Sequence, residues 1–431
     1  MSAPTDRSPP APPAPPLHGV RVLDFTQNLP GPYASLLLAS MGAEVIKVEP
    51  PRGDTGRMLG PMFDLVNAGK KSIVLDLKSP EGRTRLDRLL SHVDVLLEGF
   101  RPGRMEQLGG GPDHARDRNP RLVYCSMSGY GQAGPYREYP GHDLNFQALT
   151  GVCHMMRSAS DRPLGSALPI ADLSSGLSAV ATIVAALYGR ERDGRGRHID
   201  VALADTVLSW AYLWSEGLTP SDARLSGTLR PVSRWLDAQG SGQPRARPYL
   251  ERASRWLGRA QTARLVDRFG EQLKKTHAWQ NLVRLRLHAL PHYALYQTRD
   301  ERWLSVGIVD ERKFWVALCE SLELPGPVRR SLVAIPLGAR MITSPPVRRV
   351  LARAFAQRTL EQWLRDFDRA RIPVAPVLPV TEALHDPQLA TRVLDPHGRA
   401  TTPFPFANVP LGRAPTLGEH TEQIFATLPS R

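Results

Sequence analysis

Hydrophobic and polar positions are arranged in short blocks along the first third of the chain, and the blocks alternate between strand and helix periods. The run GVRVLDFT (19–26) is rich in β-branched residues and predicts a strand. The run SLLLASMG, which ends at Gly42, predicts a helix, and Glu44 to Val48 predicts a second strand. These elements together have the length of a βαβ unit.

The same pattern then repeats. SIVLDL (72–77), DVLLEGF (94–100) and RLVYCSMSGYG (121–131) predict strands. SPEGRTRLDRLLSHV (79–93) predicts a helix with Ser79 as N-cap and Pro80 in its first turn. Because such alternation is typical of a parallel sheet covered by helices, we predict an α/β fold.

The pattern changes in the last third of the chain. HYALYQT (292–298) and WLSVGIV (303–309) predict a hairpin around the turn RDER, and RKFWVALCESLELP (312–325) predicts a helix. Residues 358–384 predict a helix, a crossing bracketed by prolines and another helix. We therefore predict a second, smaller α+β domain at about 291–384, and a disordered proline-rich tail at 1–16.

Composition bears on the cellular location of the protein and on its possible membrane and metal partners. No run reaches the roughly 20 uncharged apolar residues of a membrane span, since the longest candidate (168–189) contains Asp172. The proline-rich start does not resemble a secretory signal. Three scattered cysteines, Cys125, Cys153 and Cys319, suit neither a disulfide framework nor a zinc site. We predict a cytoplasmic protein with no membrane partner and no metal.

The formal charge of +13 is concentrated in one segment. Residues 219–290 contain fourteen Lys and Arg against five Asp and Glu. No nucleic-acid-binding motif accompanies them, so a solvated basic surface is the simpler interpretation and an anionic ligand such as a nucleotide is the alternative. We predict no nucleic-acid partner.

The first strand is followed by QNLPGPYAS (27–35), which has one glycine where a dinucleotide fingerprint needs three. A Walker A motif is absent from the sequence. Dinucleotide redox chemistry and P-loop phosphoryl transfer are both disfavoured.

Seven sequence blocks, in this order, resemble those of the family III CoA-transferases (the CaiB/BaiF family), which include the α-methylacyl-CoA racemases. The blocks are GVRVLDFTQNLPGPYASLLLASMGAEVIKVEPPRGD, NAGKKSIVLDLKSPEG, DVLLEGFRPGRMEQLG, NPRLVYCSMSGYGQAGPYRE, GHDLNFQALTG, DGRGRHIDVAL and RAPTLGEHTEQI. The resemblance runs from about Leu17 to the end of the chain and is weakest in the basic segment.

This resemblance implies a large Rossmann-like CoA-binding domain at 17–215, completed by about 385–431, with a linker and basic helical insertion at 216–290 before the small domain. It also implies an interlocked homodimer and an acyl-CoA thioester as substrate. Coenzyme A would enter as part of that substrate, with no permanently bound cofactor.

The resemblance also assigns residues to coenzyme A. The block EGFRPG supplies Gly99, Phe100 and Arg101, with Arg104 following on the same turn. An arginine there can form charge-assisted hydrogen bonds to a pyrophosphate. Further basic candidates near predicted strands are Lys71 and Arg52, with Lys47 and Lys70 beside them. A solvated surface charge is the alternative for each.

The racemases of this family carry a GHD histidine followed thirty residues later by an aspartate, which matches His142 and Asp172. Racemisation needs two proton-transfer groups on opposite faces of an α-carbon. Imidazole and a carboxylate of raised pKa suit that task. The Asp143 backbone N–H is a candidate oxyanion donor, and its side chain a candidate helix cap or a partner that orients His142.

The resemblance leaves other roles open. In the family's CoA transferases the residue at the Asp172 position is a nucleophile that forms a mixed anhydride and then an aspartyl-CoA thioester. The histidine, the EGFRPG block and Leu29 favour the racemase, which we predict to act on a 2-methylacyl-CoA. A non-catalytic acyl-CoA-binding homologue is a third possibility.

The racemases also place a glutamate in the small domain. Here the block VGIVDERKFW has one residue more than the racemase pattern, so either Asp310 or Glu311 matches that glutamate. Either could hydrogen-bond His142 across a dimer interface, or both could be surface turn residues.

Overall fold

The computed structural model describes residues 14–156, 162–215, 290–309, 311–335, 340, 344–394 and 411–429. The chain divides into two compact units, one of 1–156, 163–211 and 387–431 and the other of 157–162 and 212–386. Most of the predicted tail, the basic insertion up to residue 289 and Asp310 lie outside the described residues.

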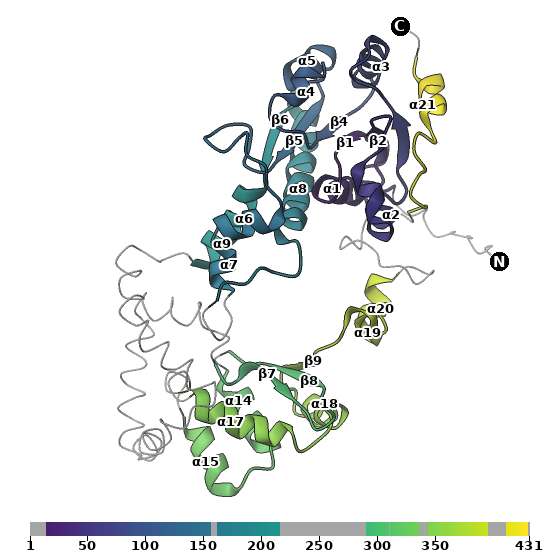
Figure 1. Ribbon diagram of the computed structural model, residues 1–431. Coiled ribbons are helices and arrows are strands. Elements are labelled where there is room, and N and C mark those ends of the chain that lie inside the picture. Colours follow the sequence, from purple (N-terminus) through teal and green to yellow (C-terminus); the bar gives the residue numbers. More distant parts are fainter. Residues whose placement is uncertain are drawn as a thin grey trace, which may run out of the picture. The chain divides into compact units, whose positions relative to one another are not determined.

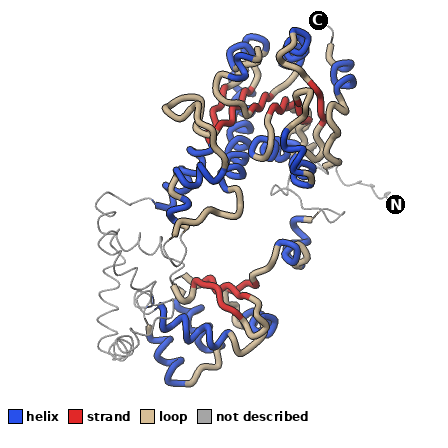
Figure 2. The backbone as a smooth tube through the Cα atoms, viewed as in Figure 1, coloured by secondary structure: helices blue, strands red, loops and turns tan. Residues whose placement is uncertain are grey.

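The first unit is built on a six-stranded sheet (Figures 1 and 2). Its strands are β1 (Arg21–Phe25), β2 (Glu44–Glu49), β3 (Lys71–Val74), β4 (Val95–Glu98), β5 (Val123–Ser128) and β6 (His198–Ala202). The order is β3-β2-β1-β4-β5-β6 and every pair is parallel. The predicted α/β fold is confirmed. The strand order reverses between β1 and β4, and at such a point ligands bind beyond the carboxyl ends of the strands.

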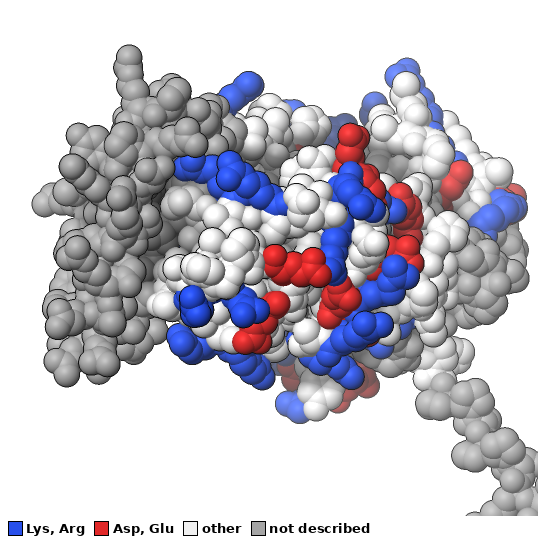
Figure 3. Space-filling model, turned by 90° about the horizontal axis from the view of Figure 1, so that it is seen from below, with Lys and Arg blue, Asp and Glu red and all other residues white. Residues whose placement is uncertain are grey.

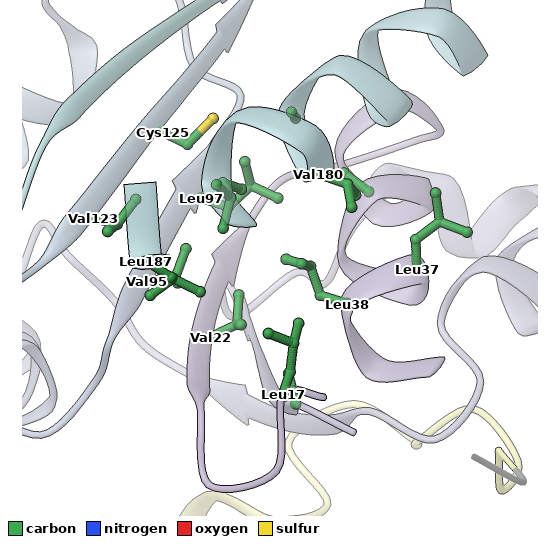
Figure 4. Packing of buried hydrophobic residues seen from close by; sticks show 14 of the residues in the cluster. Leu17, Val22, Leu37, Leu38, Val95, Leu97, Val123, Cys125, Val180 and Leu187 are labelled. Carbon is green, nitrogen blue, oxygen red and sulfur yellow. The ribbon is translucent and has the colours of Figure 1, made fainter. Parts of the chain in front are cut away.

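Two helices cover one face of this sheet, α1 (Pro30–Ser40) and α8 (Ile170–Asp193). Side chains alternate between faces along each strand, so Val95 and Leu97 join the cluster beneath these helices while Leu96 joins the opposite one. Figure 4 shows Leu38 of α1 and Val180 of α8 beside Val22, Val95 and Leu97 of the strands. This apolar layer holds α8 against the sheet through its middle and later turns, and Asp172 lies at the amino end of the same helix.

The opposite face is covered by α3 (Pro80–Leu90), α5 (Pro112–Arg118) and α21 (Thr421–Thr427). Ser79 caps α3 as predicted, since its Oγ accepts the Gly82 N–H at 3.0 Å. The segment before α21 pairs with the edge strand β3, where the His420 N–H donates to the Ser72 carbonyl at 2.9 Å. Residues far apart in sequence therefore complete one hydrophobic layer and cover one sheet edge.

The first unit contains further helices. They are η1 (Thr55–Leu59), α2 (Pro61–Val66), α4 (Arg104–Gln107), α6 (Asp143–Leu149), α7 (Val152–Met155) and α20 (Pro387–Val393). Helix α9 (Leu203–Ser215) begins in the first unit, and its last four residues belong to the second.

The second unit has an antiparallel sheet of order β7-β8-β9, made of β7 (Tyr293–Gln297), β8 (Trp303–Gly307) and β9 (Val374–Pro376). The hairpin of β7 and β8 is confirmed. The crossing bracketed by prolines forms a strand, β9, because its backbone pairs with Leu304 to Val306. The sequence did not predict this strand. In the described part of this unit the helices include α14 (Arg312–Ser321), α15 (Gly326–Ala334), α17 (Ser344–Phe355), α18 (Leu360–Arg369) and α19 (Val380–Ala383).

The first helix begins earlier than predicted, at Pro30 instead of Ser35. Proline is favoured at the first helical position because its missing N–H has no intrahelical partner there. Gly31 permits a close turn, since a Cβ at this position would lie 2.2 Å from the Thr26 Cβ. The proline-rich run therefore starts a helix and does not form a loop.

Helix α8 is long and apolar enough, by length and composition alone, to cross a membrane. Half of its most apolar stretch is buried inside the protein, and a central helix of a folded domain has the same properties. The expectation that no segment spans a membrane stays a prediction.

Charged side chains are mixed on the face drawn in Figure 3, where blue and red groups lie next to one another. Ion pairs of the second unit include Arg358 with Asp366 at 2.5 Å and Arg365 with Glu361 at 2.9 Å. This face therefore carries no broad field of a single sign.

Candidate active site

The turn EGFRPG follows β4 at the carboxyl edge of the sheet, where the strand order reverses. Gly99 faces β1, since a Cβ there would lie 3.7 Å from Thr26 Cγ2. Phe100 is partly buried against the core, while Arg101 is exposed. The fold thus places Gly99, the Phe100 ring and the exposed guanidinium of Arg101 at the carboxyl edge of the sheet. Ligands of doubly wound sheets usually bind at this edge.

Glu98 supports this turn from beneath, and sequence reasoning missed it. It is the last residue of β4, it is buried, and its Oε2 accepts the Phe100 N–H at 2.7 Å. Burial raises the pKa of Glu98 to about 7. A carboxylate at the end of an apolar strand is the sequence signal that could have identified it.

The other predicted CoA contacts divide between two edges of the sheet. Arg52 is exposed just after β2, at the carboxyl edge, and Arg104 begins α4 with its guanidinium 2.9 Å from Gln107 Oε1. Lys71 begins β3 at the amino edge and forms an ion pair with Glu44. The structure therefore groups Arg52 and Arg104 with Arg101, and it separates Lys71 from them.

Two further lysines, Lys47 and Lys70, belong to a buried ion cluster with Asp24 and Asp54. Lys47 Nζ lies 2.7 Å from Asp54 Oδ2, and Lys70 Nζ lies 3.3 Å from Asp24 Oδ2 and 2.7 Å from Ser35 Oγ. All four residues are buried. Both lysines are therefore internal ion-pair partners, neither solvated charges nor accessible phosphate contacts.

The pKa values in this cluster follow from burial and pairing. Burial alone would raise the pKa of Asp24, but Lys70, Lys47 and two hydroxyl groups hold it below its ordinary value. Burial lowers the pKa of Lys70 to about 7, and the attraction of Asp24 opposes this. The cluster fixes the end of β1 beneath α1.

The amino end of α1 lies at the same edge but differs from a dinucleotide site. Pro30 and Pro32 lack N–H groups, and the Tyr33 N–H is already donated to the Leu29 carbonyl at 2.9 Å. A pyrophosphate at a helix terminus needs several free amides. The sequence lacks the glycine fingerprint of a dinucleotide site, and the structure shows the corresponding feature: the amino end of α1 offers few free backbone N–H groups to a phosphate.

His142 is the N-cap residue of α6, in extended conformation with φ −129° and ψ 170°. Its backbone N–H donates to Asn145 Oδ1 at 3.0 Å, and its side chain is exposed. The Asn145 side chain thus accepts the N–H of the N-cap residue, which is one half of a capping box, and the His142 side chain is exposed to solvent.

Asp143 connects α6 to α8. Its Oδ1 accepts the Ala171 N–H at 2.6 Å and the Asp172 N–H at 3.2 Å. The N-cap residue of α8, Pro169, has no side-chain acceptor, so Asp143 provides the cap from another helix. Its carboxylate is thus hydrogen-bonded to the amino end of α8.

Asp172 lies in the first turn of α8 and is partly buried. Burial, and then the negative charge of Asp143, raise the pKa of Asp172 to about 6, while nearby His142 opposes the rise. The structure therefore brings His142, Asp143 and Asp172 together; we call these three residues the His–Asp site.

Glu311 belongs to the second unit, where it is the N-cap residue of α14. Its Oε2 accepts the Val309 N–H at 3.0 Å. Its alternative, Asp310, lies outside the described residues.

The first unit also contains an aromatic pocket of about 170 Å³ next to α6. Its lining comprises Tyr130, Ala133, Pro135, Tyr136, Leu149, Thr150, Ala204, Asp205 and Leu208. The pocket lies beside the glycine-containing loop 129–141 and does not include the His–Asp site. Over the described ranges, no group of three or more His, Cys, Asp or Glu side chains could hold a metal ion.

Known proteins provide the remaining comparison. The chain is 29% identical over 422 residues to human α-methylacyl-CoA racemase, covering 95% of this chain and 92% of that protein. It is 31% identical over 394 residues to acetyl-CoA:oxalate CoA-transferase of Acetobacter aceti, covering 89% and 86%. Relatives of both reaction classes therefore match along nearly the whole chain.

Solved structures agree with these sequence matches. A CAIB/BAIF family protein from Brucella suis superposes with a TM-score of 0.72 at 25% identity, covering 97% of this chain and all of that chain. Rv3272 from Mycobacterium tuberculosis gives a TM-score of 0.69 at 28% identity, with 95% and 98% covered.

The sequence profile of CoA-transferase family III matches residues 17–224 and 255–421. This match spans both units and includes all three residues of the His–Asp site. The protein is therefore an enzyme of CoA-transferase family III, as the sequence blocks predicted.

Proposed function

We propose that the protein racemises or epimerises a 2-methylacyl-CoA by proton transfer at the α-carbon. The observation that carries this proposal is Asp172, whose pKa is raised to about 6 beside the exposed imidazole of His142. A general acid or base is most effective when its pKa lies near the working pH. Asp172 would be an inefficient proton donor at the ordinary carboxyl pKa of about 4.

In this mechanism one residue of the pair removes the α-proton and the other returns a proton to the opposite face. If His142 is the base, neutral imidazole becomes imidazolium, the α-carbanion is delocalised into the thioester as an enolate, and protonated Asp172 delivers its proton to the α-carbon. The reverse direction exchanges the two roles. The backbone N–H of Asp143 is the donor that we assign to the enolate oxygen.

Coenzyme A would bind at the carboxyl edge of the sheet. Arg101, Arg104 and Arg52 are the basic residues at that edge, and a guanidinium matches phosphate oxygens in a bidentate geometry. Gly99 permits close approach of the ligand to the turn, and Phe100 presents a ring beside it. Lys71 remains a predicted contact, although its side chain pairs with Glu44.

The second candidate is transfer of CoA between carboxylic acids, and the full-length match to a CoA-transferase favours it. In that reaction ionised Asp172 attacks the thioester carbonyl and expels CoA thiolate, giving a mixed anhydride. The thiolate then attacks the aspartyl carbonyl and releases the carboxylate product, leaving an aspartyl-CoA thioester. A raised pKa does not prevent this attack, since Asp172 is ionised above about pH 6.

One experiment separates the two reactions. The enzyme is incubated with a 2-methylacyl-CoA in D2O, and both the thioester and the protein are analysed by mass spectrometry. Deuterium at the α-carbon that disappears in a His142→Ala variant supports racemisation. A CoA-sized adduct on Asp172, cleaved by hydroxylamine, with no α-deuteration, supports transfer and contradicts the racemase. Binding with neither product would identify a homologue without either activity.

We also propose that the working enzyme is a cytoplasmic homodimer. Glu311, or its neighbour Asp310, would then reach the His142 of the second copy, as the family resemblance predicts. Sedimentation of the purified protein tests the dimer, and a Glu311→Gln variant with unchanged turnover would contradict that role of Glu311.

A further inference from the structure

Gln147 lies one helical turn after Asp143 on α6, and its side chain is fully buried. Its Nε2 donates to Asp143 Oδ2, and its Oε1 accepts the Ser166 N–H at 2.9 Å. Both polar ends of the amide are therefore used. A buried amide is costly without such partners, so the side chain is held in one orientation.

The two oxygens of Asp143 are divided between two helices. Oδ2 accepts from Gln147 on α6, and Oδ1 accepts from the first-turn amides of α8. Ser166 lies in the segment that leads into α8. One amide side chain thus connects α6, the Asp143 carboxylate and the entry to α8.

The two members of the predicted catalytic pair lie on either side of this connection. His142 directly precedes α6, and Asp172 is in the first turn of α8. Among the described residues no hydrogen bond joins the side chains of His142 and Asp172 directly, so their relative position depends on how the two helix ends are held together. A displacement of about 1 Å at a reacting group can reduce a rate roughly 10²-fold.

We propose that Gln147 is a positioning residue: it holds the Asp143 carboxylate against the amino end of α8 and thereby fixes Asp172 relative to His142. The expected effect of Gln147 on turnover rests on the proposed function. The contacts themselves do not: Gln147 holds the Asp143 carboxylate, and this carboxylate accepts the first-turn amides of α8. We call this pair of residues the clamp.

The first test removes the clamp and leaves the fold intact. Gln147→Leu keeps the volume of the side chain and removes both hydrogen bonds. We expect kcat to fall about 10- to 100-fold and KM for acyl-CoA to stay within about twofold, because Gln147 is fully buried and its hydrogen bonds go to Asp143 and Ser166, which are not proposed CoA contacts. The reaction followed is whichever one the D2O experiment assigns to the wild type.

Thr150→Val is the matched control. Thr150 is a buried polar residue on the turn that ends α6, and its hydroxyl donates to the Phe146 carbonyl without contacting Asp143. The control should retain kcat within about twofold. Equal losses in both variants, or no loss in Gln147→Leu, would overturn the positioning role.

A second measurement is independent of activity. Hydrogen exchange at the Ala171 and Asp172 amides should become at least about tenfold faster in Gln147→Leu than in the wild type, because the acceptor for these amides is no longer held. Unchanged protection would overturn the clamp itself. If exchange is faster and the wild type catalyses neither reaction, the clamp stands and the proposed function fails.

The charge of Asp143 is tested by Asp143→Asn, which retains an oxygen acceptor for α8. Without the neighbouring negative charge, the pKa of Asp172 should fall toward its ordinary value. In the direction in which ionised Asp172 acts as base or nucleophile, the acid limb of the kcat/KM profile should therefore move to lower pH. An unmoved limb in a folded variant would show that Asp143 does not act on Asp172.

Discussion

Two groups of charged residues in the first unit carry similar chemistry and differ in how they are partnered. In the buried ion cluster each charge lies against an opposite one, as Lys47 does against Asp54 at 2.7 Å. In the His–Asp site Asp172 is partly buried near a second carboxylate, Asp143, and burial first and then that negative charge raise the pKa of Asp172 to about 6. Buried charges of opposite sign satisfy one another, whereas burial of a carboxylate beside a like charge raises its pKa and prepares it to exchange a proton near neutral pH.

The largest difference between the two groups should be seen in catalysis. We expect Asp172→Asn to lower kcat about 10³-fold or more, since proton transfer by a positioned side chain contributes about 10² to 10⁴ and a lost nucleophile costs at least as much. Turnover is measured at saturating acyl-CoA. A residual activity above a tenth of wild type would remove Asp172 from the chemistry under either proposed reaction.

Substitutions in the buried ion cluster should instead lower the free energy of unfolding. Lys47→Met leaves Asp54 buried without its cation, and breaking a buried pair in this way costs about 3–5 kcal/mol. The free energy of unfolding is measured in urea. The folded fraction should bind acyl-CoA with unchanged Kd, and a selective loss of affinity with normal stability would reverse our assignment of Lys47.

Arg101 should affect ligand binding alone. Arg101→Gln removes a charge-assisted hydrogen bond worth about 1.5–3 kcal/mol, so Kd for acyl-CoA should rise at least about tenfold at low salt. Calorimetry at two salt concentrations measures the change. Arg116→Gln, which removes an exposed arginine paired with Asp113 on α5, is the control, and Lys71→Gln tests the predicted contact at the other edge.

The smallest expected effect is a gain in stability. The pKa of Asp172 is higher in the folded chain, about 6, than the ordinary 3.8, so the folded protein binds more protons and loses stability as pH rises between these values. Asp172→Asn should therefore be more stable than wild type above pH 6, by about 1 kcal/mol after allowing for solvent screening, and the gain should vanish below pH 4. Thermal unfolding at both pH values checks the sign.

The sequence predicted the elements whose signals are local. The strands up to Ser128 and the hairpin of β7 and β8 follow from their apolar runs, and α3 follows from Ser79 and Pro80. Strand β9 was missed because its strand character comes from pairing with β8 and not from its own proline-rich residues. Local sequence contains no information about such a partner.

The site shows the same limit. The resemblance assigned His142 and Asp172, and the structure brings them together through Asp143. Gln147 could have been suspected, since it is four residues from Asp143 on one helix face, but its second partner, Ser166, is set by tertiary folding. The burial of Lys47 and Lys70 likewise depends on partners outside their own strands.

The attachment of the last helix to the first domain has a consequence for synthesis of the chain. Helix α21 and the segment before it cover β3 and the face lined by Ile73, residues made about 350 positions earlier. At about 5–20 residues per second, a ribosome needs roughly 20–70 s to cover that distance. The nascent first unit therefore spends tens of seconds with the part of this apolar face next to α21 and one sheet edge uncovered, which is the kind of surface that chaperones protect from aggregation.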